Sequence, residues 1–110
     1  MKTLYISDMD GTLLQNNGKM SEYTKEKLND FYKKGIPFSV ATARSMVSAT
    51  SLLEGVHFAA PIVLMNGVFV YDIETKKAVK YHEIEHSALS KILNCFYEKN
   101  LHPFMFLYSD

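Results

Sequence analysis

Cysteine is nearly absent from this 110-residue sequence, in which Cys95 is the single example. One thiol cannot form a disulfide within the chain, and no cysteine-based metal site can be built from it. This scarcity is typical of reducing compartments, so we expect a cytoplasmic protein. Cys95 lies beside Leu93 and Phe96 in an apolar stretch with helical spacing. We therefore expect this side chain to pack in a core rather than to react.

An excess of charge and long hydrophobic runs are also lacking. Lysine plus arginine and aspartate plus glutamate number 12 each, so the formal net charge is zero. No global field would then attract nucleic acid or an anionic membrane surface. No apolar run is long enough to cross a bilayer, and the N-terminus does not have the pattern of a signal peptide. We expect no nucleic-acid partner and no membrane association.

Short apolar runs alternate with segments of helical periodicity over the first 81 residues. Strands are expected at 4–6, 37–41 and 61–65, and helices at 23–34 and 46–54. The third strand is apolar throughout, as strands covered on both faces are. An Asn-Gly pair at 66–67 predicts a hairpin, with short antiparallel strands at 68–71 and 78–81. The β-α-β-α-β order predicts an α/β fold with a parallel sheet and right-handed crossovers.

A second unit is expected to begin near residue 82, where the pattern changes. A helix with an apolar stripe is predicted at 87–99, and an apolar strand at 103–108. The sequence ends two residues after that strand, before any partner for it. We expect residues 82–110 to be the beginning of a further domain that is cut off.

Acidic and polar residues follow the ends of the predicted strands. Asp8 and Asp10 follow the first strand, Thr42 the second and Asn66 the third. In open α/β sheets, ligands bind beyond the carboxyl ends of the strands. Gly11 permits a curl that brings both carboxylates into one pocket, where a divalent cation would relieve their repulsion. Oxygen ligands without histidine or cysteine suit Mg²⁺. The alternative for the two aspartates is an Asx-turn or a helix cap.

The segment Asp8–Leu14, with the sequence DMDGTLL, resembles the first motif of the haloacid dehalogenase-like (HAD) phosphatases. The Thr-Ala-Arg tip at 42–44 is similar to the second motif of the Cof-type subgroup, and so is the hairpin at 66–67. The resemblance covers residues 1–81. It implies that these residues form the N-terminal part of a Rossmann-like HAD core domain, and that residues 82–110 begin an α+β cap domain.

The resemblance implies a role for each matching residue. Asp8 would attack phosphorus and become an aspartyl phosphate, and Asp10 would protonate the leaving alcohol and then deprotonate the water. The side chain of Asp8 and the backbone carbonyl of Asp10 would hold Mg²⁺. The hydroxyl of Thr42 and the backbone N–H groups of Met9 and Ala43 would hold phosphate oxygens. The implied activity is that of a Mg²⁺-dependent phosphatase acting on a small phosphorylated metabolite, such as a sugar phosphate.

Other roles and functions stay open at this point. Arg44 is expected at the surface or at a helix start and Asn66 in a turn, and a contact of either with the substrate is the alternative. A phosphomutase is an alternative function that Asp8 and Asp10 alone leave open. A phospho-acceptor receiver domain would need an aspartate after the third strand, where this sequence has Met65 and Asn66 instead.

The pattern of the resembled family is incomplete in this sequence. Its members also need a lysine from a third motif and further aspartates from a fourth, which in Cof-type proteins follow the cap. No residue between 81 and 110 matches them by position. A further alternative is therefore a catalytically incomplete chain that binds a cation or phosphate, or that assembles with another chain.

The first strand is expected to have an open edge. In the strand order of this family the first strand is central, and the C-terminal half supplies its neighbours on one side. In this chain the edge formed by Leu4, Tyr5 and Ile6 would be exposed, and an apolar open edge is a template for pairing. We expect a homo-oligomer, or assembly with a C-terminal half, through this edge.

Overall fold

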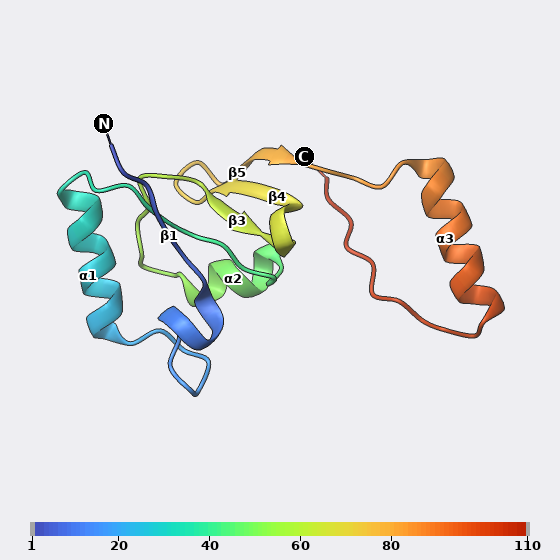
Figure 1. Cartoon of the computed structure of the whole chain (residues 1–110), viewed down its shortest axis with the longest axis horizontal. Coiled ribbons are helices and arrows are strands. Elements are labelled where there is room, and N and C mark those ends of the chain that lie inside the picture. The colour runs from blue at the N-terminus through green and yellow to red at the C-terminus, as the bar shows by residue number, and fades with distance from the viewer. Residues whose placement is uncertain (1, 110) are drawn as a thin grey trace.

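A computed structural model describes residues 2–109 of the chain. Figure 1 shows a mixed α/β core, with helix α3 standing to one side of it. The strands are β1 (Tyr5–Ser7), β2 (Phe38–Val40), β3 (Ile62–Leu64), β4 (Phe69–Asp72) and β5 (Lys77–Tyr81). The helices are α1 (Glu22–Lys33), α2 (Met46–Leu52) and α3 (His86–Glu98). This order confirms the predicted α/β fold, with small shifts at the ends of the elements.

The strands follow one another in the order β1-β2-β3-β4-β5. β1 and β2 are parallel, with Tyr5 opposite Phe38 and Ser7 opposite Val40. A single parallel bridge between Ala41 and Val63 joins β2 to β3. β3, β4 and β5 then form an antiparallel meander. The carboxyl ends of β1, β2 and β3 therefore meet at one edge, as the sequence predicts.

Local signals in the sequence explain where α1 begins and ends. The hydroxyl of Ser21 accepts a hydrogen bond from the N–H of Thr24 at 3.2 Å, which caps the first turn. At the other end Gly35 adopts a φ of +67°, a left-handed conformation that costs glycine little. The N–H of Ile36 then donates to the carbonyl of Phe31 at 2.9 Å and closes the helix end. The predicted glycine stop of this helix is confirmed.

The Asn-Gly hairpin between β3 and β4 is also confirmed. The N–H of Val68 donates to the carbonyl of Met65 at 3.2 Å across Asn66 and Gly67. Met65 has a φ of +50° and so leaves the extended conformation. For this reason β3 ends at Leu64, one residue earlier than the sequence predicts.

The hydrophobic core lies between the sheet and helices α1 and α2. Met9, Val40, Ile62 and Leu64 are fully buried in it, and α1 and α2 each contribute a buried residue to it. The buried hydroxyl of Ser39 donates to the carbonyl of Pro61 at 2.6 Å, so its polar group is satisfied. The core therefore fixes β2 and β3 directly, and the buried Met9 anchors the chain shortly after β1, whose own residues are not buried.

The strand predicted at 103–108 does not form. This segment has no regular structure, and the side chains of Phe104 and Leu107 are 97% and 84% exposed. A strand needs a neighbour for its backbone N–H and C=O groups, and in the described chain no strand pairs with this segment. The ring of Tyr108 does pack against that of Phe69, with centroids 5.1 Å apart. High β propensity alone was not enough for a strand here.

Helix α3 forms as predicted but buries no side chain among its residues. Cys95, on this helix, is exposed, so the expectation that it packs in a core was wrong.

The radius of gyration is 16.7 Å, larger than the roughly 13 Å of a compact domain of this length. The excess reflects the separation of α3 from the core (Figure 1). Among the described residues, no helix has both the length and the apolar character needed to cross a membrane.

Candidate functional site

Asp8 is the first residue after β1 and lies at the carboxyl end of that strand. Its Oδ1 atom accepts a hydrogen bond from the N–H of Met9 at 2.7 Å. The side chain of Met9 is fully buried, which anchors the start of the following turn in the core. Asp8 itself is exposed. It is therefore a cap, one of the two predicted roles, and its carboxylate still faces solvent.

The chain turns sharply after Asp8. Residues Met9–Leu13 form a turn wider than an α-helical one, closed by a 2.9 Å hydrogen bond from the N–H of Leu14 to the carbonyl of Met9. Within it Asp10 is extended, with ψ of 128°, and Gly11 has φ of +74°. No atom lies within 4 Å of a Cβ built on Gly11, so the backbone conformation and not space calls for glycine. The predicted curl is confirmed.

The Asp10 carboxylate meets the guanidinium of Arg44 at this edge of the sheet. Arg44 Nε donates to Oδ2 at 2.8 Å, and Nη2 donates to Oδ1 at 2.7 Å. This paired geometry joins the turn after β1 to the loop after β2. Hydrogen bonding to Arg44 lowers the pKa of Asp10 below its ordinary value, and the same bonds raise the pKa of Arg44.

This ion pair was not predicted from the sequence. Arg44 Nη1 also donates to the hydroxyl of Ser48 at 2.8 Å, four residues further along. Arg44 precedes α2, which begins at Met46, so the spacing of four residues could not by itself show that these two side chains meet. No local pattern could have shown that Asp10, 34 residues earlier, lies opposite them. The expectation that Arg44 is only a surface or helix-start residue was too limited.

The loop after β2 carries the other two predicted phosphate ligands. The N–H of Ala41 donates to the carbonyl of Ser7 at 2.9 Å, which ties the start of this loop to the end of β1. Thr42 is 5% exposed, and its Oγ1 accepts from the N–H of Arg44 at 3.1 Å. Ala43 is exposed, and its N–H donates no hydrogen bond within the described part of the chain. This N–H is therefore available to an anion.

The β3–β4 turn supports the same loop from the other side. The N–H of Asn66 donates to the carbonyl of Thr42 at 3.2 Å, and that of Met65 donates to the carbonyl of Arg44 at 3.0 Å. Met65 and Asn66 have φ values of +50° and +55°, which are costly for residues other than glycine. The two hydrogen bonds help to hold this strained backbone. Asn66 thus contacts the site through its backbone, and a substrate contact of its side chain stays a prediction.

The oxygen donors at this edge fit part of a Mg²⁺ coordination shell. Among the described residues no group of three or more His, Cys, Asp or Glu side chains could hold a metal. The Asp8 carboxylate and the backbone carbonyl of Asp10 are oxygen donors of the kind Mg²⁺ prefers, whereas Arg44 occupies both carboxylate oxygens of Asp10. Mg²⁺ often takes only one or two carboxylates and fills its shell with waters and phosphate. The donor set is compatible with Mg²⁺ but does not complete its shell.

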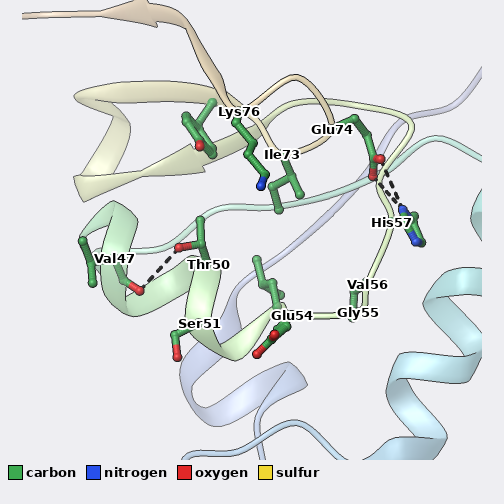
Figure 2. Close-up of a pocket in the computed structure, with 12 residues that line it drawn as sticks. Val47, Thr50, Ser51, Glu54, Gly55, Val56, His57, Ile73, Glu74 and Lys76 are labelled. Carbon is green, nitrogen blue, oxygen red and sulfur yellow. Dashed lines mark hydrogen bonds and ion pairs between the residues drawn. The ribbon is translucent and has the colours of Figure 1, made fainter. Parts of the chain in front are cut away.

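A cavity of about 680 Å³ lies elsewhere, between the end of α2 and the turn from β4 to β5 (Figure 2). Thr50, Glu54, His57 and Lys76 are among the residues that line it. His57 Nδ1 lies 3.0 Å from Glu74 Oε1, and this pair closes one side. None of the residues predicted from the sequence as a site lines this cavity. It is separate from the edge that carries the two aspartates.

The sequence of residues 5–110 matches the family described as haloacid dehalogenase-like hydrolases. The chain belongs to this family. The family predicted from the DMDGTLL motif is therefore confirmed. The match includes residues 82–110, but the cap domain that the resemblance implied for them stays a proposal.

Several curated relatives of the chain are named as phosphatases. The chain is 33% identical over 93 residues to "Putative phosphatase MG265" of Mycoplasma genitalium, an alignment that covers 84% of this chain and 34% of that protein. It is 29% identical over 79 residues to "5-amino-6-(5-phospho-D-ribitylamino)uracil phosphatase YitU" of Bacillus subtilis, covering 72% of this chain and 29% of that protein. The chain thus spans about a third of the length of the curated relatives it matches.

The fold is shared with solved structures of the same family. A haloacid dehalogenase-like hydrolase from Bacteroides thetaiotaomicron superposes with a TM-score of 0.77 at 20% sequence identity. The match covers 91% of this chain and 39% of that one. The Rossmann-like HAD fold predicted for the core is therefore shown for this partial chain.

Proposed function

We propose that this chain carries the nucleophile of a Mg²⁺-dependent phosphatase. The observation that carries the proposal is the position of Asp8 at the carboxyl end of β1. One of its oxygens is fixed by the N–H of Met9, and the residue is exposed to solvent. The loop with Thr42 and the N–H of Ala43 is tied to the end of the same strand. An acidic nucleophile and anion donors thus share one edge, as phosphoryl transfer requires.

The proposed reaction has two steps at phosphorus. A carboxylate oxygen of Asp8 forms a bond to phosphorus while the bond to the leaving oxygen breaks, and Asp10 gives that oxygen a proton. Asp10 then takes a proton from water, whose oxygen attacks phosphorus and releases Asp8. The Thr42 hydroxyl and the N–H of Ala43 would hold phosphate oxygens, and the N–H of Met9 would join them by exchanging its bond to Asp8 for one to phosphate. When bound, Mg²⁺ would neutralise phosphate charge, held by the Asp8 side chain and the Asp10 carbonyl.

The ion pair with Arg44 bears directly on the proposed role of Asp10. Arg44 lowers the pKa of Asp10, so in the free protein this carboxyl group is ionised near neutral pH. An ionised Asp10 suits the second step, in which it acts as a base. For the first step it must take up a proton, and the negative charge of a bound phosphate ester would favour that uptake.

The substrate class is inferred from the relatives and from the site. The Bacillus subtilis relative is named for a phosphorylated ribitylamino compound, which is a small metabolite. A small phosphorylated metabolite, such as a sugar phosphate, is the class we propose for this chain. A phosphomutase would use the same two aspartates, and the hydrolysis assay below distinguishes it because a mutase retains the phosphoryl group.

The test is Mg²⁺-dependent phosphate release from p-nitrophenyl phosphate by the 110-residue protein. Because the lysine and further aspartates of the family pattern are missing, we expect only weak turnover, which a chelator abolishes, which Asp8→Asn lacks, and which Asp10→Asn reduces by about 10²–10⁴-fold. Asp30→Asn, on α1 and outside the site, is the matched control and should leave the rate unchanged. Turnover that survives in Asp8→Asn, or that ignores the chelator, would contradict the proposal.

A second candidate function is binding of a cation or phosphate without turnover. Two observations argue against turnover by this chain alone. The described residues contain no group of three metal-ligating side chains, and the chain spans about a third of its relatives. Under this alternative the wild-type protein releases no phosphate, yet inorganic phosphate still perturbs the amide signals of Met9 and Ala43. Turnover would then require another chain that supplies the missing groups.

A further inference from the structure

Arg44 is the only arginine in the sequence, although lysine and arginine together number 12. This single guanidinium uses its Nε, Nη1 and Nη2 atoms in hydrogen bonds shorter than 3 Å. Two of the bonds reach Asp10 and the third reaches Ser48. A lysine ammonium is a point charge and cannot form such a planar fork. The arrangement therefore depends on the residue type and not only on its positive charge.

The position of Arg44 is set by three separate parts of the chain. Its N–H donates to the hydroxyl of Thr42 at 3.1 Å, and its carbonyl accepts from the N–H of Met65 at 3.0 Å. Ser48, in the first turn of α2, holds the far end of the side chain at 2.8 Å. The side chain is consequently only 28% exposed. Arg44 is thus fixed at both its backbone and its tip.

Asp10 is held far less firmly by its own surroundings. Its side chain is 54% exposed, and it projects from a turn whose backbone is not helical at this residue. An exposed aspartate can populate several rotamers, and each wrong rotamer would aim the carboxylate elsewhere. The bidentate bonds from Arg44 fix both oxygens at once. Arg44 is more buried and is held by more hydrogen bonds, so it sets the position of the more exposed Asp10 carboxylate.

We propose that Arg44 is a positioning residue, which fixes the Asp10 carboxylate at the edge of the sheet that also carries Asp8, and which is itself oriented by Ser48. What Asp10 does there rests on the proposed phosphatase function. The placement of Asp10 by Arg44 does not depend on turnover. Arg44 acts through Asp10, and the geometry assigns it no contact with the substrate.

The sole arginine makes the proposal directly measurable by NMR. The protein should give one arginine Nε–H signal, and hydrogen bonding to Asp10 should slow its exchange with solvent. In Asp10→Asn, which keeps the shape but not the charge of the acceptor, we expect that exchange to become at least about tenfold faster. Ser48→Ala should produce a smaller change of the same sign. An exchange rate that is equal in wild type and Asp10→Asn would overturn the ion pair.

The decisive readout is the side-chain rotamer of Asp10, measured by the coupling between its Cγ and backbone nitrogen. We expect a single rotamer in the wild type and an averaged coupling in both Arg44→Gln and Arg44→Lys. Added guanidinium ion should restore the single rotamer in Arg44→Gln. A single rotamer that persists in both variants would overturn the positioning role. If Arg44→Gln does not fold, Arg44→Lys still decides the positioning role, and Asp10→Asn still tests the ion pair on which it depends.

Inorganic phosphate separates this proposal from the proposed function. If phosphate shifts the amide signals of Met9 and Ala43 while the Arg44 signal stays in place, both proposals stand. If the Arg44 signal moves and its exchange accelerates as phosphate binds, then Arg44 is an anion ligand and the positioning role fails. If the two amide signals do not respond, the phosphate site fails, while the rotamer of Asp10 still tests Arg44.

Discussion

The carboxyl group of Asp10 shows how one residue links charge to pH dependence. Its pKa lies below the ordinary value of 3.8, first because of the hydrogen bonds from Arg44. A carboxyl group with a lowered folded-state pKa stabilises the fold above its unfolded-state pKa, and that stability is lost as pH falls through the folded-state value. Because Asp10 is well exposed, we expect the effect to be small.

The change that tests this is Arg44→Gln, followed by urea unfolding from pH 7 down to pH 2. We expect the variant to be less stable than the wild type at pH 7, and the difference to shrink as the pH falls below about 3.8. Lys91→Gln removes a positive charge from α3 instead and should show no such pH dependence. A difference between wild type and Arg44→Gln that stays constant down to pH 2 would show that the ion pair does not stabilise the fold.

Comparing Gly11→Ala with Gly18→Ala separates the cost of backbone strain from an effect on the Asp10–Arg44 ion pair. The φ values of the two glycines are +74° and +75°, and nothing lies within 4 Å of a Cβ built on either one. Alanine at each position should therefore cost a similar free energy of unfolding, about 1–2 kcal/mol, from the left-handed backbone alone. Only Gly11 lies in the turn with Asp10, so only Gly11→Ala should speed solvent exchange of the Arg44 Nε–H. An equal effect of Gly18→Ala on that signal would mean that the turn is not specifically coupled to the site.

At the scale of elements, the sequence predicted what local chemistry decides. Ser21 and Gly35 mark the two ends of α1, and the Asn-Gly pair marks the β3–β4 turn, because caps and left-handed residues act over a few neighbours. The order of strands and the meeting of their carboxyl ends also followed from the β-α-β pattern. The positions of Asp8 and Thr42 at one edge could thus be predicted without the structure.

What could not be predicted depends on contacts between distant segments. The segment 103–108 is apolar and rich in aromatic residues, but whether it forms a strand depends on a partner that the described chain does not provide. The ion pair between Asp10 and Arg44 depends on how a turn and a loop approach each other across the sheet edge. Only the three-dimensional arrangement contains that information, and the same holds for the exposed position of Cys95 on α3.

At the scale of the molecule, the sheet has two outer strands of different character. β5 forms one edge and carries Lys77 and Lys80, and charged residues on an edge discourage pairing with other strands. β1 forms the other edge, and its three residues carry no charge. Tyr5 and Ile6 on β1 are 54% and 55% exposed. In the described chain β1 pairs with β2 alone, so its other side lacks a neighbouring strand.

We therefore propose that the protein associates through the β1 edge, with a second copy or with a C-terminal half of the same family. The N–H of Tyr5 and the carbonyl of Ser7 form hydrogen bonds toward β2. Because backbone groups alternate along a strand, those of Ile6 point outward, away from β2.

Light scattering over a concentration series should show association for the wild type. Ile6→Lys should suppress it by charging that edge, whereas Val79→Lys on β5, a residue of similar exposure, should not. A wild-type protein that stays monomeric at the highest concentration would rule out self-association. A C-terminal half of a relative, supplied as a separate chain, should then bind instead. If it does not bind either, the proposal that β1 is an association edge is wrong.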